Sequence, residues 1–102
     1  MTREIRYLDE AREDLRAEVS WYREHRGVHV AECFLDEISE AVELLAELPD
    51  AGPVSALDSR VRIRNLRRIR HTIVYQVRPA TIFILAIAHM RRRPGYWLDR
   101  VT

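Results

Sequence analysis

The residues best suited to chemistry lie close together in the last part of the sequence. His89 is followed by three consecutive arginines at 91–93 and then by Tyr96 and Trp97. Seven consecutive apolar residues at 82–88 precede them and predict a buried strand that delivers these side chains to one place. Imidazole, guanidinium and phenol groups gathered in this way are typical of a phosphate or RNA site. A basic segment after a strand is also commonly a solvated face or a partner-binding segment, so that alternative stays open.

RNA cleavage without a metal requires a base for the 2′-hydroxyl, positive charge for the phosphate and an acid for the leaving oxygen. We expect His89 to act as acid or base, because its unperturbed pKa is about 6.5 and such proton transfer is worth roughly 10² to 10⁴ in rate. Arg92 would bind the scissile phosphate together with Arg62 and Arg64 from an earlier strand. A structural, hydrogen-bonded role also fits the position of His89.

Two aromatic residues complete this candidate site. Tyr96 could donate a proton or stack on a base, and the arginines around it would lower its pKa. Trp97 offers a second stacking surface. Arg70 and Arg93 are further candidates for contacts with RNA phosphates.

The remaining residues give no sign of a metal or cofactor. No pair of the four histidines has metal-ligand spacing alongside carboxylates, so we predict neither a metal nor a cofactor. The three glycines, at 27, 52 and 95, form no glycine-rich phosphate loop. His71 is expected to be structural. Cys33 is the single cysteine, cannot form an internal disulfide, and is expected to be a packing residue within a helix.

Charge is divided unevenly along the chain. Residues 1–51 hold 6 Arg and 14 Asp or Glu, which gives −8, and residues 52–102 hold 11 Arg and 2 Asp, which gives +9; the sum is the net +1 of the whole sequence. All 17 basic residues are arginine, whose planar guanidinium suits bidentate contacts. The acidic half would repel nucleic acid and confine such a ligand to the basic half.

The first half of the sequence predicts one strand and two helices. Residues 3–8 alternate apolar and charged side chains, as a half-buried strand does. Asp9 is a good N-cap for a helix that runs to about His25, with apolar residues in one stripe, and Gly27 ends it. A second helix is expected at 30–48, and it forms an antiparallel hairpin with the first.

The second half predicts a sheet. Strands are expected at 61–64, 70–77 and 81–88, the last one central and covered on both faces. With the first strand they give a single α+β domain over 1–102, in the order βααβββ. The helical hairpin packs on a mostly antiparallel four-stranded sheet. No apolar run approaches the roughly 20 residues of a membrane span, and no signal peptide is visible, so we predict a cytoplasmic protein.

Particular residues in this order are also found in a known superfamily. In the helical half they are Ala-Arg-Glu-Asp-Leu at 11–15, Trp-Tyr at 21–22, Ala-Glu-Cys-Phe-Leu at 31–35 and Leu-Leu-Ala-Glu-Leu-Pro-Asp-Ala-Gly at 44–52. In the sheet half they are Val-Arg-Ile-Arg-Asn-Leu at 61–66, Ile-Val-Tyr-Gln-Val at 73–77 and the strand at 84–89 followed by Arg92, Arg93, Pro94 and Tyr96. The chain therefore resembles the RelE/ParE superfamily of toxins from bacterial type II toxin–antitoxin pairs over nearly its whole length.

The resemblance implies a toxin that arrests growth, with two mechanisms open. RelE-like toxins cut messenger RNA in the ribosomal A site, and Arg62, Arg64, Arg92 and Tyr96 match their basic and tyrosine positions. Thr72 departs from that pattern, since a basic residue usually stands there; Arg70, two residues away on the same face of a strand, could substitute.

ParE-like toxins poison DNA gyrase without nuclease chemistry, and the long helical hairpin favours that branch. In either case the resemblance implies an antitoxin that wraps the toxin and covers its basic groove. The expected partners are therefore an antitoxin, together with either the ribosome and messenger RNA or DNA gyrase. An inactive domain that only binds an antitoxin or nucleic acid is the third alternative.

Overall fold

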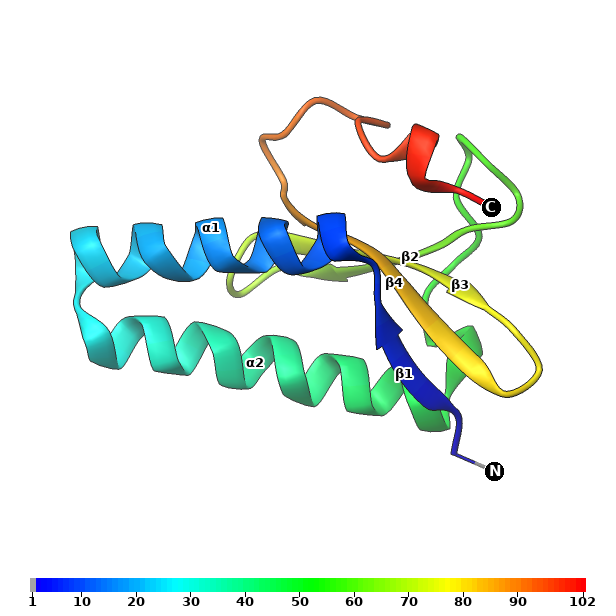
Figure 1. The fold of residues 1–102 in the computed structure, drawn as a ribbon, viewed down its shortest axis with the longest axis horizontal. Helices are drawn as coiled ribbons and strands as arrows, with labels where there is room; N and C mark the ends of the chain where they lie inside the picture. The colour runs from blue at the N-terminus through cyan, green and yellow to red at the C-terminus, as the bar shows by residue number, and fades with distance from the viewer. Residues whose placement is uncertain (1) are drawn as a thin grey trace.

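A computed structural model describes residues 2–102 of the protein. These residues form four strands, two long helices and two short 3-10 helices (Figure 1). In chain order they are β1 (Glu4–Tyr7), α1 (Asp9–Arg26), α2 (Val28–Glu47), η1 (Pro49–Ala51), β2 (Arg62–Leu66), β3 (His71–Val77), β4 (Thr81–His89) and η2 (Leu98–Arg100). The predicted order of strands and helices is confirmed.

The helices form a tight hairpin because one residue joins them. Gly27 has φ of 94°, in the region that favours glycine, and α2 begins at Val28, two residues before the predicted start. The apolar stripe of α1 packs on the core as expected, and so do Phe34, Ile38 and Leu45 from α2. Leu48, the last residue of the predicted second helix, is 56% exposed and follows the end of α2 at Glu47.

The sheet has the strand order β1-β4-β3-β2. β4 pairs in parallel with β1 and antiparallel with β3, and β2 pairs antiparallel with β3, so the sheet is mostly antiparallel as predicted. β4 is nearly buried along its length because both faces of the sheet are covered. The α+β fold, with the hairpin on one face of this sheet, is confirmed.

A buried tyrosine fixes the crossing from the helices to the sheet. Tyr75 on β3 is 0% exposed; its hydroxyl donates to the carbonyl of Pro49 at 2.7 Å and accepts from the backbone N–H of Gly52 at 2.9 Å. These two bonds hold η1 against the sheet. Gly52 passes so close that a Cβ there would lie 2.5 Å from the carbonyl oxygen of Ile63.

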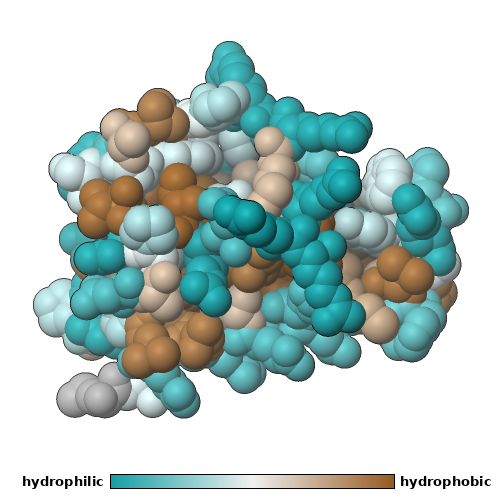
Figure 2. Space-filling model, turned by 180° about the vertical axis from the view of Figure 1, so that it is seen from behind, coloured by the Kyte–Doolittle hydropathy of each residue, from teal (hydrophilic) through white to brown (hydrophobic). Residues whose placement is uncertain are grey.

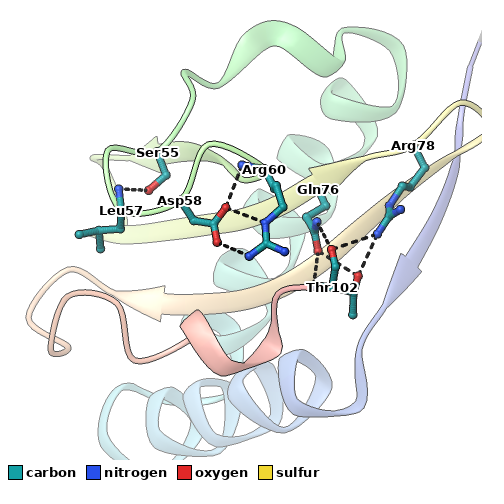
Figure 3. A network of polar contacts seen from close by, with 7 residues as sticks. All are labelled: Ser55, Leu57, Asp58, Arg60, Gln76, Arg78 and Thr102. Atoms are coloured by element: carbon teal, nitrogen blue, oxygen red, sulfur yellow. Dashed lines mark hydrogen bonds and ion pairs between the residues drawn. The ribbon is translucent and has the colours of Figure 1, made fainter.

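The face of the sheet opposite the hairpin is covered by the C-terminal segment, residues 90–102 (Figure 1). Its Trp97 and Val101 pack with Val61, Val74 and Leu85 in a second apolar cluster. The end of the segment is tied to the sheet, because Gln76 and Arg78 hydrogen-bond to Thr102 (Figure 3).

The structure corrects the expectations for Cys33 and Arg70. Cys33 is exposed on α2 and is therefore no core residue. Arg70 does not belong to β3, which begins at His71; it closes the turn from β2 with φ of 55°. The argument that Arg70 shares a strand face with Thr72 is therefore wrong.

None of the helices formed by residues 2–102 is long and apolar enough to cross a membrane.

The Gly52 contact predicts a loss of stability on adding one methyl group. Gly52→Ala should lower the free energy of unfolding by about 1–3 kcal/mol, because the carbonyl of Ile63 and the hydroxyl of Tyr75 would have to move. Urea denaturation measures this change. Gly27→Ala isolates the backbone effect of a methyl group: its Cβ would meet no atom within 4 Å, so its cost of about 1–3 kcal/mol comes only from φ of 94° and ψ of 165°. A loss well below about 1 kcal/mol in Gly52→Ala would contradict the close approach.

Candidate functional site

The candidate residues do not form a single site; the structure places them in three settings. His89 and Arg70 line a groove between the helical hairpin and the turn from β2 to β3. Arg92 lies in the turn after His89, with its guanidinium 4.1 Å from the centre of the Tyr96 ring, beside α1. Arg62 and Arg64 belong to the opposite edge strand of the sheet, which β3 separates from β4.

The C-terminal segment is held by one carboxylate of α1. Asp14 Oδ2 accepts hydrogen bonds from Arg100 Nη1 at 2.7 Å, from the hydroxyl of Tyr96 at 3.0 Å and from the backbone N–H of Ile87 at 3.2 Å. The side chains of Asp14 and Arg100 are 8% and 13% exposed. Arg100 also donates to the carbonyl of Leu85 at 3.0 Å. A largely buried, hydrogen-bonded ion pair thus joins α1, β4 and the C-terminal segment.

Tyr96 and Trp97 are in settings that differ from the expected ones. Burial, and then the negative charge of Asp14, raise the pKa of Tyr96, whereas the nearby arginines were expected to lower it. Its hydroxyl is already donated to Asp14. Trp97 is 4% exposed and packs in the second apolar cluster, so its ring is not a stacking surface for a base.

Arg62 and Arg64 contact the backbone around η1. Arg62 Nη1 donates to the carbonyl of Gly52 at 2.8 Å, and its Nη2 lies 3.3 Å from Asp50 Oδ1. Arg64 Nη1 reaches the carbonyl of Ala51 at 3.4 Å, while its Nε is buried without a hydrogen-bond partner. Arg62 and Arg64 thus hold the connection between α2 and β2 in place. The remaining candidate, Arg93, is exposed on the C-terminal segment.

The groove beside His89 has a volume of about 920 Å³. We call it the hairpin groove. The helices line it with aromatic and apolar side chains and with three charged ones, and the turns line it mainly with arginines. The residues are Ala17, Glu18, Trp21, Tyr22, Arg26, Val30, Cys33, Phe34, Glu37, Arg68, Ile69, Arg70, His89 and Arg91. From behind, the molecule shows hydrophilic side chains beside a hollow, with hydrophobic surface on the hairpin end beyond it (Figure 2). Trp21 is 46% exposed.

The exposed arginines concentrate at this end of the molecule. The backbone N–H of Met90 donates to the carbonyl of Arg70 at 2.9 Å, which places the turn at 67–70 next to the turn after β4. Six arginines on these two turns are exposed and define what we call the basic end: Arg67, Arg68, Arg70, Arg91, Arg92 and Arg93. Of these, Arg68 pairs with Glu37 at 3.0 Å.

His89 is a neutral imidazole at the edge of the hairpin groove. Partial burial, followed by the charges of His71, Arg91 and Arg70, lowers its pKa, while Glu18 opposes this effect. Its Nδ1 accepts the backbone N–H of Arg91 at 3.0 Å. Of the proposed catalytic residues, His89 alone has a setting that would suit a base. The arginines expected to bind the phosphate beside it, Arg62 and Arg64, lie on the opposite edge strand of the sheet.

The residues that organise this region were not identified from the sequence. Asp14, Glu18 and Trp21 all lie on α1, where they looked like ordinary members of a surface face. The only sequence feature that could have pointed to a structural role for Asp14 was the position of its carboxylate next to the apolar stripe of the helix. Residues 2–102 contain no group of three or more His, Cys, Asp or Glu side chains that could hold a metal ion.

The Asp14 contacts predict a large effect of removing one charge. Asp14→Asn should lower the free energy of unfolding by about 3–5 kcal/mol, because Arg100 keeps its charge in a buried place without a counter-ion. Thermal unfolding measures the loss. Glu13→Gln on the same helix breaks only the exposed pair with Arg16 and should cost less than about 1 kcal/mol. Similar costs for the two changes would show that Asp14 is not the anchor of the C-terminal segment.

Comparison with known proteins agrees with this architecture. A solved structure titled as the chromosomal ParDE TA system from P. aeruginosa is similar, with a TM-score of 0.77 and 25% identity over 88% of this chain and 98% of that chain. A mutant of the E. coli toxin RelE in the free state shares the fold, with a TM-score of 0.69 and 17% identity over the full length of both chains. No curated protein sequence matches this chain.

The family itself is given by a sequence model. The model described as the ParE toxin of the type II toxin-antitoxin system, parDE, matches residues 5–94. This range includes the strands, the hairpin and the turns of the basic end. The protein therefore belongs to the ParE toxin family and is the toxin of a type II toxin–antitoxin pair.

Proposed function

We propose that this toxin acts by binding DNA gyrase, the target that the resemblance to ParE-like toxins implies, and not by cutting messenger RNA. One observation carries the proposal: the side chains that RNA cleavage would need are dispersed and already occupied. Tyr96 donates its proton to Asp14, and Arg62 donates to Gly52. A cleavage site needs its donors pre-positioned around one phosphate, and no such phosphate position is common to His89, Arg92 and Arg62.

The basic end supports a binding role. Its arginines are exposed on two neighbouring turns and border a groove with an aromatic wall. Arginine and aromatic residues are enriched in protein interfaces, where they contribute much of the binding energy. The acidic faces of α1 and α2 would repel a long nucleic acid that extended beyond the groove, which favours a protein as the ligand.

An antitoxin is the second partner that we propose. It would cover the basic end and so compete with the target for the same surface. Binding to the folded toxin alone would also stabilise it by mass action.

Two assays on the same purified protein separate the mechanisms. We expect gyrase supercoiling activity to fall as toxin is added, while primer extension on messenger RNA in a bacterial translation reaction finds no new 5′ ends. Tyr96→Phe should behave like the unchanged toxin in both assays, since the phenol has no chemical role. New 5′ ends inside codons that appear only when ribosomes translate, and disappear in Tyr96→Phe, would establish messenger RNA cleavage instead.

Arg70 allows binding to be separated from folding. Its φ of 55° costs an arginine roughly 1 kcal/mol, which glycine does not pay. Arg70→Gly should therefore be at least as stable as the unchanged protein, yet inhibit gyrase more weakly because an exposed charge of the basic end is lost. Arg60→Ala, which removes an arginine paired with Asp58 outside the basic end, is the control. Equal inhibition by all three proteins would exclude Arg70 from the contact.

A further inference from the structure

A second groove, with a volume of about 360 Å³, lies between α1 and the C-terminal segment. We call it the acidic groove, because four of the eight residues that line it are carboxylates. Two of its residues, Ala17 and Glu18, also line the hairpin groove, so the two grooves meet on α1. The lining consists of Glu10, Glu13, Asp14, Ala17, Glu18, Ile87, Arg92 and Arg100.

One face of α1 runs along both grooves. The residues at 10, 13, 14, 17, 18 and 21 line one groove or the other, and their spacing of three and four places them in a single stripe. With a rise of about 1.5 Å per residue, the stripe from Glu10 to Trp21 is about 16 Å long. Ala17 is exposed in the middle of the stripe, where its small side chain leaves the passage between the grooves open.

The hairpin groove carries an excess of positive charge. Glu37 is paired with Arg68 at 3.0 Å, and Glu18 Oε2 lies 3.0 Å from His71 Nε2. Carboxylates of a ligand would therefore meet unpaired guanidinium groups here. Within residues 2–102, three arginines of the lining form no ion pair: Arg26, Arg70 and Arg91.

The acidic groove has the opposite excess. Asp14 is paired with Arg100 at 2.7 Å, which leaves Glu10 and Glu13 as exposed carboxylates at its edge. Glu13 contacts Arg16, but both side chains are about 70% exposed, so this pair is weak and easily exchanged for another. Opposite charges thus lie at the two ends of one continuous surface.

The hairpin groove also offers an apolar anchor point. The ring of Trp21 stacks on His25 at 4.5 Å and 13°, and it meets Tyr22 edge-on at 5.4 Å and 88°. It nevertheless stays 46% exposed, and Val30 on the facing helix is 39% exposed. A fixed, half-exposed tryptophan among arginines is typical of the residues that dominate the binding energy of protein interfaces.

We propose that the two grooves together bind one extended segment of a partner protein. In that segment, acidic residues beside an apolar side chain lie about four residues from a lysine or arginine. Trp21 and Glu13 are eight positions apart, so they are about 12 Å apart along the helix, and an extended chain covers this distance in about four residues. The inference rests on the proposed binding function and deepens it by giving the charge pattern of the partner.

A nucleic acid strand fits only one of the two grooves. Its phosphates would be attracted by Arg70 and Arg91 but repelled by Glu10 and Glu13. A protein segment can reverse its charge within a few residues and so complement both grooves. Segments with the same composition in another order would leave charges unpaired, and the surface discriminates against them.

Two labelled peptides of identical composition test the charge pattern on the unchanged protein. The bipolar peptide has an acidic, aromatic, acidic triplet, four small polar residues and two arginines; its isomer has the acidic and basic residues interspersed. In fluorescence anisotropy the isomer should bind about tenfold more weakly, because several exposed charge contacts are lost together. Equal binding of the two peptides, or tighter binding of a single-stranded oligonucleotide, would overturn the proposal.

Ala17→Leu tests whether the grooves form one site. Leucine is a good helix former at this exposed position, so the fold should be kept while the passage is blocked. We expect about tenfold weaker binding of the bipolar peptide. Ser20→Leu is the matched control, because Ser20 is exposed on α1 and lines neither groove. Unchanged binding by folded Ala17→Leu, shown by circular dichroism, would separate the two grooves.

Replacing Glu10 and Glu13 together by glutamine tests the acidic groove. The double variant should bind the bipolar peptide several-fold more weakly, yet bind a peptide with glutamines in place of its arginines as well as the unchanged protein does. Equal losses for both peptides would show that these carboxylates do not contact the basic residues. Gyrase inhibition is measured beside these assays. A toxin that inhibits gyrase without distinguishing the peptides would exclude the shared site alone, whereas one that prefers the bipolar peptide but leaves gyrase active would contradict the proposed target alone.

Discussion

The structure depends above all on the carboxylate of Asp14. The sheet has two apolar faces, and the helices can cover only one of them. The other face is closed by the C-terminal segment, whose apolar contribution is Trp97 and Val101 with part of Tyr96. So few side chains cannot hold a segment of irregular backbone by hydrophobic contact alone, because ordering each residue costs about 1–2 kcal/mol of conformational entropy. The Asp14–Arg100 ion pair supplies the missing attachment, and it does so from the helix on the other side of β4.

Some arginines of this sequence stabilise the fold itself. The chain has no lysine, so every structural task that needs a cation falls to arginine. Arg100 closes the second face, and Arg62 satisfies a carbonyl where the chain crosses from helix to sheet. Guanidinium groups are suited to this use because their forked donors can satisfy two acceptors at once. Most of the other arginines are exposed, and six of them, at 67, 68, 70 and 91–93, lie together on the two turns of the basic end.

The sequence predicts this fold well because the signals for it are local. Apolar spacing along residues 8–22 and 34–45 identifies the buried helix faces, and the continuous apolar run before His89 identifies the central strand. The candidate site was harder, because its chemistry is set by pairings across large separations. Asp14 and Tyr96 are 82 positions apart, so the sequence could not reveal that a carboxylate would raise the pKa of that phenol. Trp97 was misjudged for a similar reason, since the apolar residues that bury it come from three strand regions.

The placement of charge also bears on what the toxin can recognise. The split between an acidic and a basic half of the sequence becomes a spatial one only in part, because Arg62, Arg64 and Arg100 are half-buried and hydrogen-bonded within the fold. What remains is a basic end beside an aromatic groove, flanked by helices with acidic outer faces. A uniformly negative polymer is attracted to such a surface only over the length of the basic end, and the acidic faces of the helices repel the rest of it. A folded partner whose negative charge is confined to one region is attracted to the basic end without being repelled by the helices. Electrostatics at this surface therefore select a partner by the extent of its charge as well as by its sign.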